Sequence, residues 1–511
     1  MPDDALLRFL AQGEAYGRPG ARVERVTTHA AWIFLVGERA YKMKRPVRYS
    51  FLDFSTPAQR QAALAAELEL NRRTAPMLYH RLVAVTRSAR GELALDGAGE
   101  PVEWLLEMQR FDQAALLDRL AAERALDAAT IEALAAEIAG FHERAEVRSE
   151  RGGYAGLREV VDGNADDLAG LADNIFERAA VDALNRRTKE ELERRRTLLE
   201  ERCRAGKVRH CHGDLHLGNI VLWAGQPVLF DCLEFDPDLA TIDVLYDLAF
   251  LLMDLCHRGL RPLAQRLLSG YLDATWDDAG TALLPLFLSV RAAIRAKVEG
   301  FTAQDAGQRA EPAAAARAYL ALAAGFLDPA PPRLVAIGGV SGTGKTTLAR
   351  RLAPEIGRAP GAVLLRSDTT RKKLRRVPTT ARLGAEAYEE RVSRAVYARL
   401  MTRAEALLAA GQAAIVDAVM LDPADRARVE RLAREQGVRF DGLWLSAPAG
   451  KLAARVAARQ GDASDATAEV ALAQLAVDPG ALSWAMVDSG GDPDQVTATA
   501  RAALGLDRRE R

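Results

Sequence analysis

The feature that most constrains the fold is a glycine-rich segment toward the C-terminal end of the chain. Residues 339–346 read Gly-Val-Ser-Gly-Thr-Gly-Lys-Thr and match G-x-x-x-x-G-K-[ST] at every fixed position. An apolar stretch, 334–337, precedes the segment, and a helical pattern over 346–352 follows it. In this strand–loop–helix context the loop turns backbone N–H groups toward phosphate oxygens at the start of a helix. The alternative interpretation is a glycine-rich turn without a ligand.

This loop predicts a site for ATP and Mg²⁺. Lys345 is placed to reach the terminal phosphates, and the Thr346 hydroxyl is placed to ligate Mg²⁺. The residues predicted to bind the nucleotide are Gly339, Ser341, Gly342, Thr343, Gly344, Lys345, Thr346 and Thr347.

The sequence around the loop alternates apolar strands with helices. The predicted strands are 334–337, 362–365, 413–416, 442–445 and 484–487. Strands that alternate with helices predict a parallel α/β sheet, and the carboxyl ends of its strands face the ligand crevice.

Two aspartates follow predicted strands of this sheet. Asp417 ends the strand 413–416 and is a candidate Mg²⁺ ligand, with a solvated strand-end aspartate as the alternative. Asp368 is predicted to end another strand, in the segment Leu-Arg-Ser-Asp, and is the candidate base that accepts a proton from the acceptor hydroxyl, or else a helix cap. Arg371, three residues on, is a candidate contact for the acceptor.

Arg455 and Arg459 are the candidate lid residues. They lie four residues apart on a predicted helix and therefore share one face. The segment 461–466 that follows is rich in small and polar residues. The pair suits a lid that neutralises the transferring phosphate, and the alternative is a solvated basic face.

A second motif, His-Gly-Asp-Leu-His-Leu-Gly-Asn over 212–219, lies in the first half of the chain. An aspartate followed five residues later by an asparagine is the arrangement of a kinase catalytic loop. Asp214 is the predicted base for an acceptor hydroxyl, and Asn219 and Asp231 are the predicted Mg²⁺ ligands. A histidine-rich metal site and a plain surface loop are the alternatives.

The same interpretation requires a lysine on an N-terminal strand. Lys42 and Lys44 project on one side of a predicted hairpin, 32–44, and we favour Lys42 for the ATP phosphates with Lys44 as its rival. Glu67 lies on the helix predicted from Pro57 to about residue 74. It is the predicted ion-pair partner of the lysine, with a solvated helix charge as the alternative.

These motifs resemble two known groups. Residues 333–511 resemble the small P-loop kinases related to adenylate kinase, in particular a set of predicted kinases of the AAA_33 type. Residues 25–325 resemble the aminoglycoside phosphotransferases and choline kinases, although Cys-Leu follows Asp231 where protein kinases have Phe-Gly. The whole chain resembles the fusion described as bifunctional aminoglycoside phosphotransferase/ATP-binding proteins.

The resemblance implies two domains. A bilobal α+β domain of the protein-kinase-like fold is expected over 1–327, with an N-lobe at about 25–111 and a helical C-lobe at about 112–327. A linker is expected at 328–333, before an α/β P-loop domain with a parallel sheet over 334–511.

The bulk properties limit the partners. A formal net charge of −1 gives no general attraction to nucleic acid or anionic lipid, and no membrane span or signal segment is expected. Four cysteines without a CxxC pair suggest free thiols and a cytoplasmic protein.

The predicted activity is therefore ATP-dependent phosphorylation of hydroxyl groups on small molecules at two sites. A nucleotide-driven regulatory ATPase is one alternative. A polynucleotide 5′-kinase is the other, suggested by the basic run 371–376, although nucleic acid is the less favoured acceptor. The sequence does not set the acceptors or the oligomeric state.

Overall fold

The structure, a computed structural model, describes residues 4–28, 30–49, 52–305, 310–458 and 463–507. The chain divides into two compact units. The first comprises 1–130, 140–156 and 203–247, and the second comprises 131–139, 157–202 and 248–511. The second unit thus includes residues on both sides of the predicted linker at 328–333.

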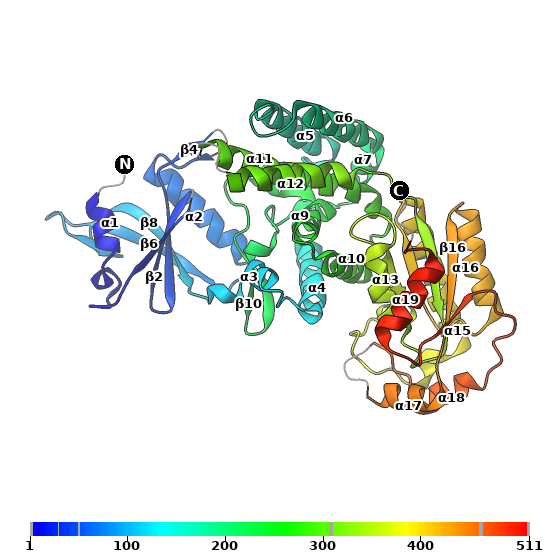
Figure 1. Cartoon of the computed structure of the whole chain (residues 1–511). Coiled ribbons are helices and arrows are strands. Elements are labelled where there is room, and N and C mark those ends of the chain that lie inside the picture. Colours follow the sequence, from blue (N-terminus) through cyan, green and yellow to red (C-terminus); the bar gives the residue numbers. More distant parts are fainter. Residues whose placement is uncertain (1–3, 29, 50–51, 306–309, 459–462, 508–511) are drawn as a thin grey trace. The chain divides into compact units, whose positions relative to one another are not determined.

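An antiparallel six-stranded sheet dominates the first part of unit 1 (Figure 1). Its strand order is β1-β2-β3-β8-β6-β7. The strands are β1 (Glu24–Thr27), β2 (Ala31–Val36), β3 (Arg39–Lys44), β6 (Tyr79–Arg87), β7 (Leu93–Leu95) and β8 (Glu100–Gln109). The predicted hairpin is confirmed, because β2 pairs antiparallel with β3 through a turn at Gly37, whose φ of +54° favours glycine.

Helix α2 (Pro57–Asn71) packs on this sheet. It begins as the sequence predicts: the Thr56 side chain accepts the Gln59 N–H, and the Gln59 side chain bonds back to the Thr56 N–H. The helix ends three residues before the predicted residue 74, and its Leu64 packs in a core with Leu78 and Leu106. Other elements here are α1 (Asp4–Leu10), β4 (Arg48–Tyr49) and β5 (Leu52–Asp53).

Short strands and loops carry the second motif. The elements are α3 (Leu117–Ala122), β9 (Val208–His210), β10 (Ile220–Trp223), β11 (Gln226–Leu229), α8 (Pro237–Ala240) and β12 (Thr241–Asp243). Within the expected helical C-lobe, Ile242 pairs with Arg209 in the β9–β12 ladder. α9 (Val244–His257) begins only after that ladder.

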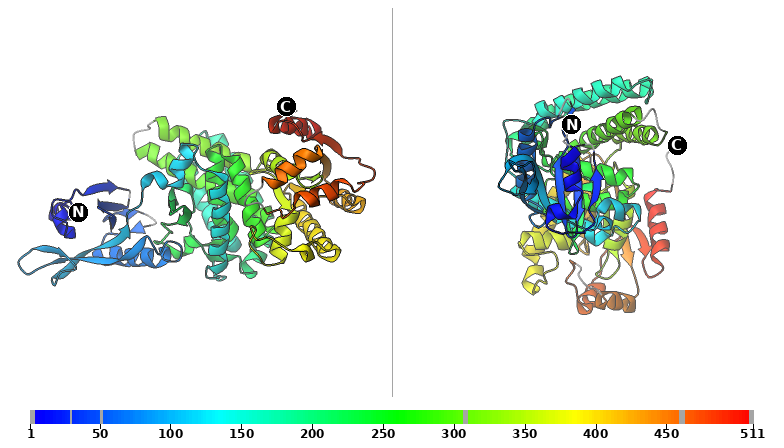
Figure 2. Two further views of the ribbon diagram at one scale, coloured as in Figure 1. Left: turned by 90° about the horizontal axis from the view of Figure 1, so that it is seen from below. Right: turned by 90° about the vertical axis from the view of Figure 1, so that its left-hand side faces the viewer.

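The predicted helical region is confirmed as helices. They are α4 (Ala128–Arg144), α5 (Gly153–Gly170), α6 (Arg178–Arg194), α7 (Arg196–Arg204), α10 (Arg261–Thr275), α11 (Leu284–Asp305) and α12 (Ala310–Phe326). α11 and α12 lie side by side (green in Figure 2). Among described residues, the stretch Ala279–Asp305 has the length and composition of a membrane span. Because 78% of its most apolar window is buried, it reads as a core helix.

The last part of unit 2 is a parallel five-stranded sheet with helices on both faces (Figure 1). The strand order is β14-β15-β13-β16-β17. The strands are β13 (Arg333–Gly338), β14 (Val363–Arg366), β15 (Ala414–Asp417), β16 (Arg439–Ser446) and β17 (Ala485–Asp488), so all five predicted strands are confirmed.

The helices around this sheet bury its apolar faces. They are α13 (Lys345–Leu352), α14 (Ser367–Leu374), α15 (Glu390–Ala409), α16 (Pro423–Glu435), α17 (Ala449–Ala457), α18 (Ala468–Leu475) and α19 (Pro493–Leu504). On one face Leu352 of α13 and Leu504 of α19 pack against Val335 and Ile415 of the strands. The chain therefore has the two predicted architectures, an α+β domain followed by an α/β domain with a parallel sheet.

Candidate active sites

The glycine-rich loop of unit 2 lines a cavity of about 920 Å³. It connects the end of β13 to the first turn of α13, as the sequence predicts. Gly339 has a φ of +132°, and a Cβ there would lie 2.4 Å from the Leu445 carbonyl oxygen. Glycine is therefore required at this position, both for the backbone conformation and for the close approach of β16.

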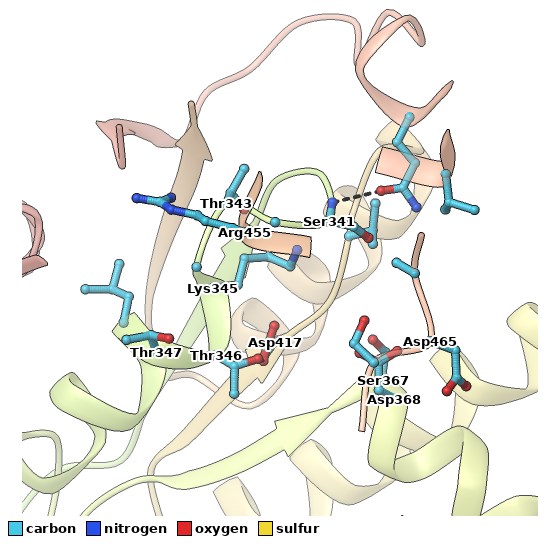
Figure 3. A pocket seen from close by; sticks show the side chains of 18 of the residues that line it. Ser341, Thr343, Lys345, Thr346, Thr347, Ser367, Asp368, Asp417, Arg455 and Asp465 are labelled. Atoms are coloured by element: carbon cyan, nitrogen blue, oxygen red, sulfur yellow. Dashed lines mark hydrogen bonds between the residues drawn. The ribbon is translucent and has the colours of Figure 1, made fainter. Parts of the chain in front are cut away.

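Lys345 and Thr346 line this cavity at the end formed by the glycine-rich loop (Figure 3). The Lys345 Nζ donates to the carbonyl oxygens of Gly339 at 2.8 Å and Val340 at 3.1 Å. The Thr346 hydroxyl donates to Asp417 Oδ2 at 2.5 Å. A hydroxyl and a carboxylate that meet in this way are the hard oxygen donors that Mg²⁺ prefers, so the residues fit this ion.

A glutamine that the sequence did not indicate lies against the loop. The Ser341 N–H donates to Gln474 Oε1 of α18 at 2.8 Å (Figure 3). The carboxamide oxygen thus takes an N–H group that the motif offers to a phosphate oxygen. No sequence pattern distinguishes Gln474 from any other polar residue on a surface helix.

Asp368 and Arg371 line the same cavity, away from the loop. Asp368 lies in the first turn of α14, which begins at Ser367, so the prediction that it ends a strand is wrong by two residues. Arg371 is only 6% exposed, and its Nη1 donates to the Ala387 carbonyl at 2.6 Å. Burial lowers the pKa of Arg371, and in the described part of the chain it makes no ion pair with a carboxylate.

A polar cluster beyond Arg371 holds together the wall on the acceptor side. Lys372 is buried and pairs with Asp465 at 3.2 Å, and the Tyr388 hydroxyl donates to the other Asp465 oxygen at 2.8 Å. Tyr388 also lies under the Arg371 guanidinium, 4.6 Å from ring centroid to Cζ. The segment after the predicted lid is thereby tied to the helix that carries Asp368.

Of the two predicted lid arginines, Arg455 lines the cavity. It lies on α17, and its Nη2 donates to the Ser489 carbonyl at 2.7 Å. Arg459 lies outside the described residues.

In unit 1, Lys42 stands between two carboxylates. Its Nζ lies 2.6 Å from Glu67 Oε1 and 2.8 Å from Asp231 Oδ1. Burial opposes the charge on Lys42, but Asp231 and Glu67 raise its pKa well above the ordinary value. Burial likewise opposes the charge on Asp231, but Lys42 holds the pKa of that carboxyl below its usual range. Lysine and aspartate are therefore both charged at neutral pH.

Lys44 occupies a more enclosed position. Its Nζ lies 2.7 Å from Glu67 Oε2 and 2.5 Å from Glu234 Oε1, and its side chain is 3% exposed against 14% for Lys42. Glu234 was not predicted, although it follows Asp231 by three residues. Lys42 is thus the lysine that contacts the predicted metal ligand Asp231, and Lys44 binds the second carboxylate oxygen of Glu67.

The three predicted residues Asp214, Asn219 and Asp231 meet in one place. The Asn219 side-chain amide donates to Asp214 Oδ2 at 2.9 Å, and Asp214 is close enough to raise the pKa of Asp231. Asp231 has a φ of +61°, which few residues other than glycine adopt. Its N–H donates to the Tyr79 hydroxyl at 3.1 Å, which supports this strained residue. Carboxylate and amide oxygens so grouped fit Mg²⁺.

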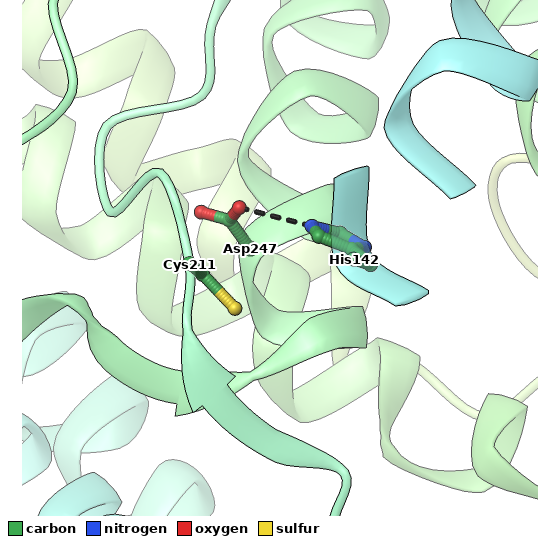
Figure 4. Close-up of side chains that lie close together, drawn as sticks. All are labelled: His142, Cys211 and Asp247. Atoms are coloured by element: carbon green, nitrogen blue, oxygen red, sulfur yellow. Dashed lines mark hydrogen bonds and ion pairs between the residues drawn. The ribbon is translucent and has the colours of Figure 1, made fainter. Parts of the chain in front are cut away.

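Asp247, which lies beside His142 and Cys211 (Figure 4), accepts two hydrogen bonds from the backbone of the motif. One carboxylate oxygen accepts the Gly213 N–H at 2.9 Å, and the other accepts the His212 N–H at 3.1 Å. His142 Nε2 lies 3.1 Å from Asp247 as well. Asp247 thus holds the backbone of the motif in place.

The histidine-rich metal site finds no support in this geometry. His212 Nε2 lies 2.9 Å from the Phe230 carbonyl, and His216 Nδ1 accepts the Gly218 N–H at 3.1 Å. These ring nitrogens therefore bind the backbone. Among described residues, His142, Cys211 and Asp247 come together as potential ligands, but Asp247 is already used by the loop.

Comparison with known proteins finds two domain families in the chain. Residues 33–283 match the family described as "Phosphotransferase enzyme family", and residues 334–478 match the family described as "AAA domain". "Uncharacterized protein Rv2004c" of Mycobacterium tuberculosis is 33% identical over 457 residues, which is 88% of this chain and 89% of that protein. "Uncharacterized protein Mb2027c" of Mycobacterium bovis gives the same values of 33%, 88% and 89%.

Two solved structures are also similar to parts of the chain. A gluconokinase from Sinorhizobium meliloti 1021 is 21% identical and covers 35% of this chain and 94% of its own, with a TM-score of 0.25. A choline/ethanolamine kinase family protein from Mesorhizobium loti is 12% identical and covers 64% of this chain and 94% of its own, with a TM-score of 0.40.

Proposed function

The chain belongs to the family that joins a phosphotransferase domain to a P-loop domain in one polypeptide, and on that premise we propose that both sites are active ATP- and Mg²⁺-dependent kinases. Each site would transfer the terminal phosphoryl group of ATP to a hydroxyl group of a small molecule. The observation that carries the proposal is that each unit brings together a lysine, a set of oxygen ligands and a further carboxylate.

At the P-loop site, phosphate oxygens would replace the loop's own carbonyls as partners of Lys345. Mg²⁺, held by Thr346 and Asp417, would neutralise charge on the leaving phosphates. Asp368 would accept the proton of the attacking hydroxyl while Arg371 and Tyr388 hold the acceptor. Arg455 would balance the charge of the phosphoryl group in transit.

At the other site, Lys42 would bind the ATP phosphates while Glu67 holds the lysine in place. Asn219 and Asp231 would hold Mg²⁺, which supplies the same neutralisation of charge. Asp214 would orient the acceptor hydroxyl and take its proton, and its hydrogen bond from Asn219 keeps it next to the metal ligands.

The acceptor of the P-loop site is proposed to be a small hydroxylated molecule that carries an anionic group. Arg371 is a buried cation in the cavity wall without a carboxylate partner among the described residues, and an anionic acceptor would supply one. We propose that the protein acts in the cytoplasm, where its four free cysteines stay reduced.

The experiment is a screen of a metabolite extract with ATP labelled at the terminal phosphate, on the parent chain and on Asp214→Ala and Lys345→Ala. We expect two labelled product sets, each lost in one variant with a fall of at least ~10²-fold, as is usual for a positioned base or a phosphate clamp. Exposed Arg376, in the turn that follows the helix of Arg371, offers a control, Arg376→Gln, that should leave both sets intact.

The result that would contradict the proposal is slow ATP hydrolysis that needs no acceptor and is insensitive to both variants. Such hydrolysis would favour a regulatory ATPase instead. Labelling of oligonucleotide 5′ ends in place of small molecules would point to the polynucleotide kinase alternative for the P-loop site.

A further inference from the structure

The first strand of the parallel sheet has an open edge. β14 pairs with β15 on one side only, because it stands at the end of the order β14-β15-β13-β16-β17. An edge strand presents N–H and C=O groups that need partners when they are buried. Helix α10, which contacts β14, supplies them from its side chains.

Two residues of α10 pair with this edge. Gln265 Nε2 donates to the Ala362 carbonyl at 2.7 Å, and the Leu364 N–H donates to Ser269 Oγ at 3.1 Å. Gln265 also donates to Ser269 Oγ at 2.8 Å, so the two side chains form one connected group. They are 3% and 9% exposed. The bonded backbone groups are two residues apart, which is the spacing that a neighbouring strand would use.

Further polar contacts surround this edge. Arg403 of α15 donates to Asp278 at 2.9 and 3.0 Å and to Asp273 at 2.7 Å, and both partners of the Arg403–Asp278 pair are less than 5% exposed. Lys373 of α14 donates to the Ala274 carbonyl at 2.6 Å. A buried charge pair has exacting geometry, so Arg403 sets the position of α15 against the end of α10, while the exposed Lys373 contact joins α14 to the same helix.

The strand that α10 contacts is followed directly by residues of the candidate P-loop site. β14 ends at Arg366, whose Nε lies 3.7 Å from Asp417, and Asp368 follows two residues later. Yet α10 lies within 33–283, the range that matches the phosphotransferase family, and not within the AAA range. The two sequence families therefore do not coincide with two independent packing units.

We propose that Gln265 and Ser269 of α10 are positioning residues for the P-loop site. Their side chains bond to the free edge of β14, where a sixth strand would otherwise pair. In this way they fix the position of β14, of Asp368 after it, and of the acceptor side of the cavity. The P-loop domain thus uses a helix of the preceding domain as part of its own catalytic framework. This proposal concerns the placement of β14 and stands whether or not the acceptor is the one proposed above.

The test uses the full-length chain with Ser269→Ala and Gln265→Leu. The measurements are amide hydrogen exchange over 363–374 and turnover per folded molecule at the P-loop site. Loss of a buried hydrogen bond should raise exchange in this segment about tenfold or more. Turnover should fall by about tenfold or more, while the Mg²⁺-ATP concentration for half-maximal rate stays within about twofold.

The matched control is Asn164→Ala. Asn164 is buried and bonds to the Val290 carbonyl within the helices, so its loss destabilises them without a contact to β14. A milder variant, Lys373→Met, keeps the test available if the buried variants do not fold, because it removes one contact between α14 and α10 at the surface. It should raise exchange over 367–374 by about twofold to fivefold.

Two outcomes would overturn the proposal. One is exchange over 363–374 that stays at the parent rate in Ser269→Ala, Gln265→Leu and Lys373→Met. The other is an equal rise in Asn164→Ala, since that would show general loosening of the helices. A rise confined to the α10 and Lys373 variants, with unchanged ATP dependence, is the expected result.

Discussion

Replacing each of the two lysines on β3 by methionine should separate catalysis from stability. Lys44 is 3% exposed, and it pairs with Glu67, at 0%, and Glu234, at 11%. Without Lys44, Glu67 keeps Lys42 as a partner, but the buried Glu234 loses this ion pair, and removing one partner from a buried ion pair costs about 3–5 kcal/mol. Lys44→Met should therefore destabilise unit 1 by that amount and lower its melting temperature by roughly 10 °C.

Lys42→Met should instead reduce turnover with little loss of stability. Glu67 would keep Lys44 as its partner, and Asp231, with a side chain 40% exposed, would be stabilised by water. The Lys42–Asp231 pair is less enclosed than the Lys44–Glu234 pair, so its loss should cost less, about 1–2 kcal/mol. Loss of the charge that faces ATP should, however, reduce turnover at this site by about 10²–10³-fold.

The assay combines thermal unfolding with turnover per folded molecule, in a Lys345→Ala background that silences the P-loop site. We expect a stable, inactive Lys42→Met and a destabilised Lys44→Met with most of its activity per folded molecule. The reverse result, with Lys44→Met stable and inactive, would refute the assignment of Lys42 to the phosphates.

Three further predictions concern single side chains. Arg371→Gln should raise the acceptor KM about tenfold or more with little change in the KM for ATP, and the Arg376→Gln control should change neither in steady-state kinetics. Gln474→Ala should tighten Mg²⁺-ATP binding about two- to tenfold in calorimetry, because the carboxamide no longer competes for the Ser341 N–H. Burial, with Arg73 and Arg148, lowers the pKa of His210 to about 4, so the unfolded chain takes up a proton on this residue at a higher pH than the folded one. Stability should therefore fall by about 3 kcal/mol as pH drops from about 6.5 to 4, and His210→Gln should flatten this dependence in denaturant titrations.

The sequence predicted the parts of the fold that depend on local patterns. The hairpin at Lys42, the start of α2 at Pro57 and the five parallel strands all follow from short-range periodicity and turn chemistry. Motif spacing likewise indicated Asp214, Asn219 and Asp231, because a kinase-type loop fixes their separation along the chain.

Contacts between segments far apart in sequence were not predictable in this way. Gln474 meets Ser341 across 133 residues, and Gln265 meets Ala362 across 97, and neither glutamine stands out from its neighbours in the sequence. Glu234 lies only three residues after the predicted ligand Asp231, but its pairing with Lys44 depends on how β3 packs and could not be predicted from the spacing. These contacts arise from tertiary packing, which local sequence preferences do not encode.

We propose that one chain holds two separate sites for a nucleoside triphosphate. The most direct test of this proposal is the stoichiometry of binding of a non-hydrolysable ATP analogue with Mg²⁺, measured by titration calorimetry on the parent chain, Lys42→Met and Lys345→Ala. We expect the parent chain to bind two equivalents of the analogue. Lys42→Met should lose or greatly weaken binding at the unit 1 site, and Lys345→Ala should do so at the P-loop site. A single equivalent in the parent, abolished by Lys345→Ala and unaffected by Lys42→Met, would contradict the proposal.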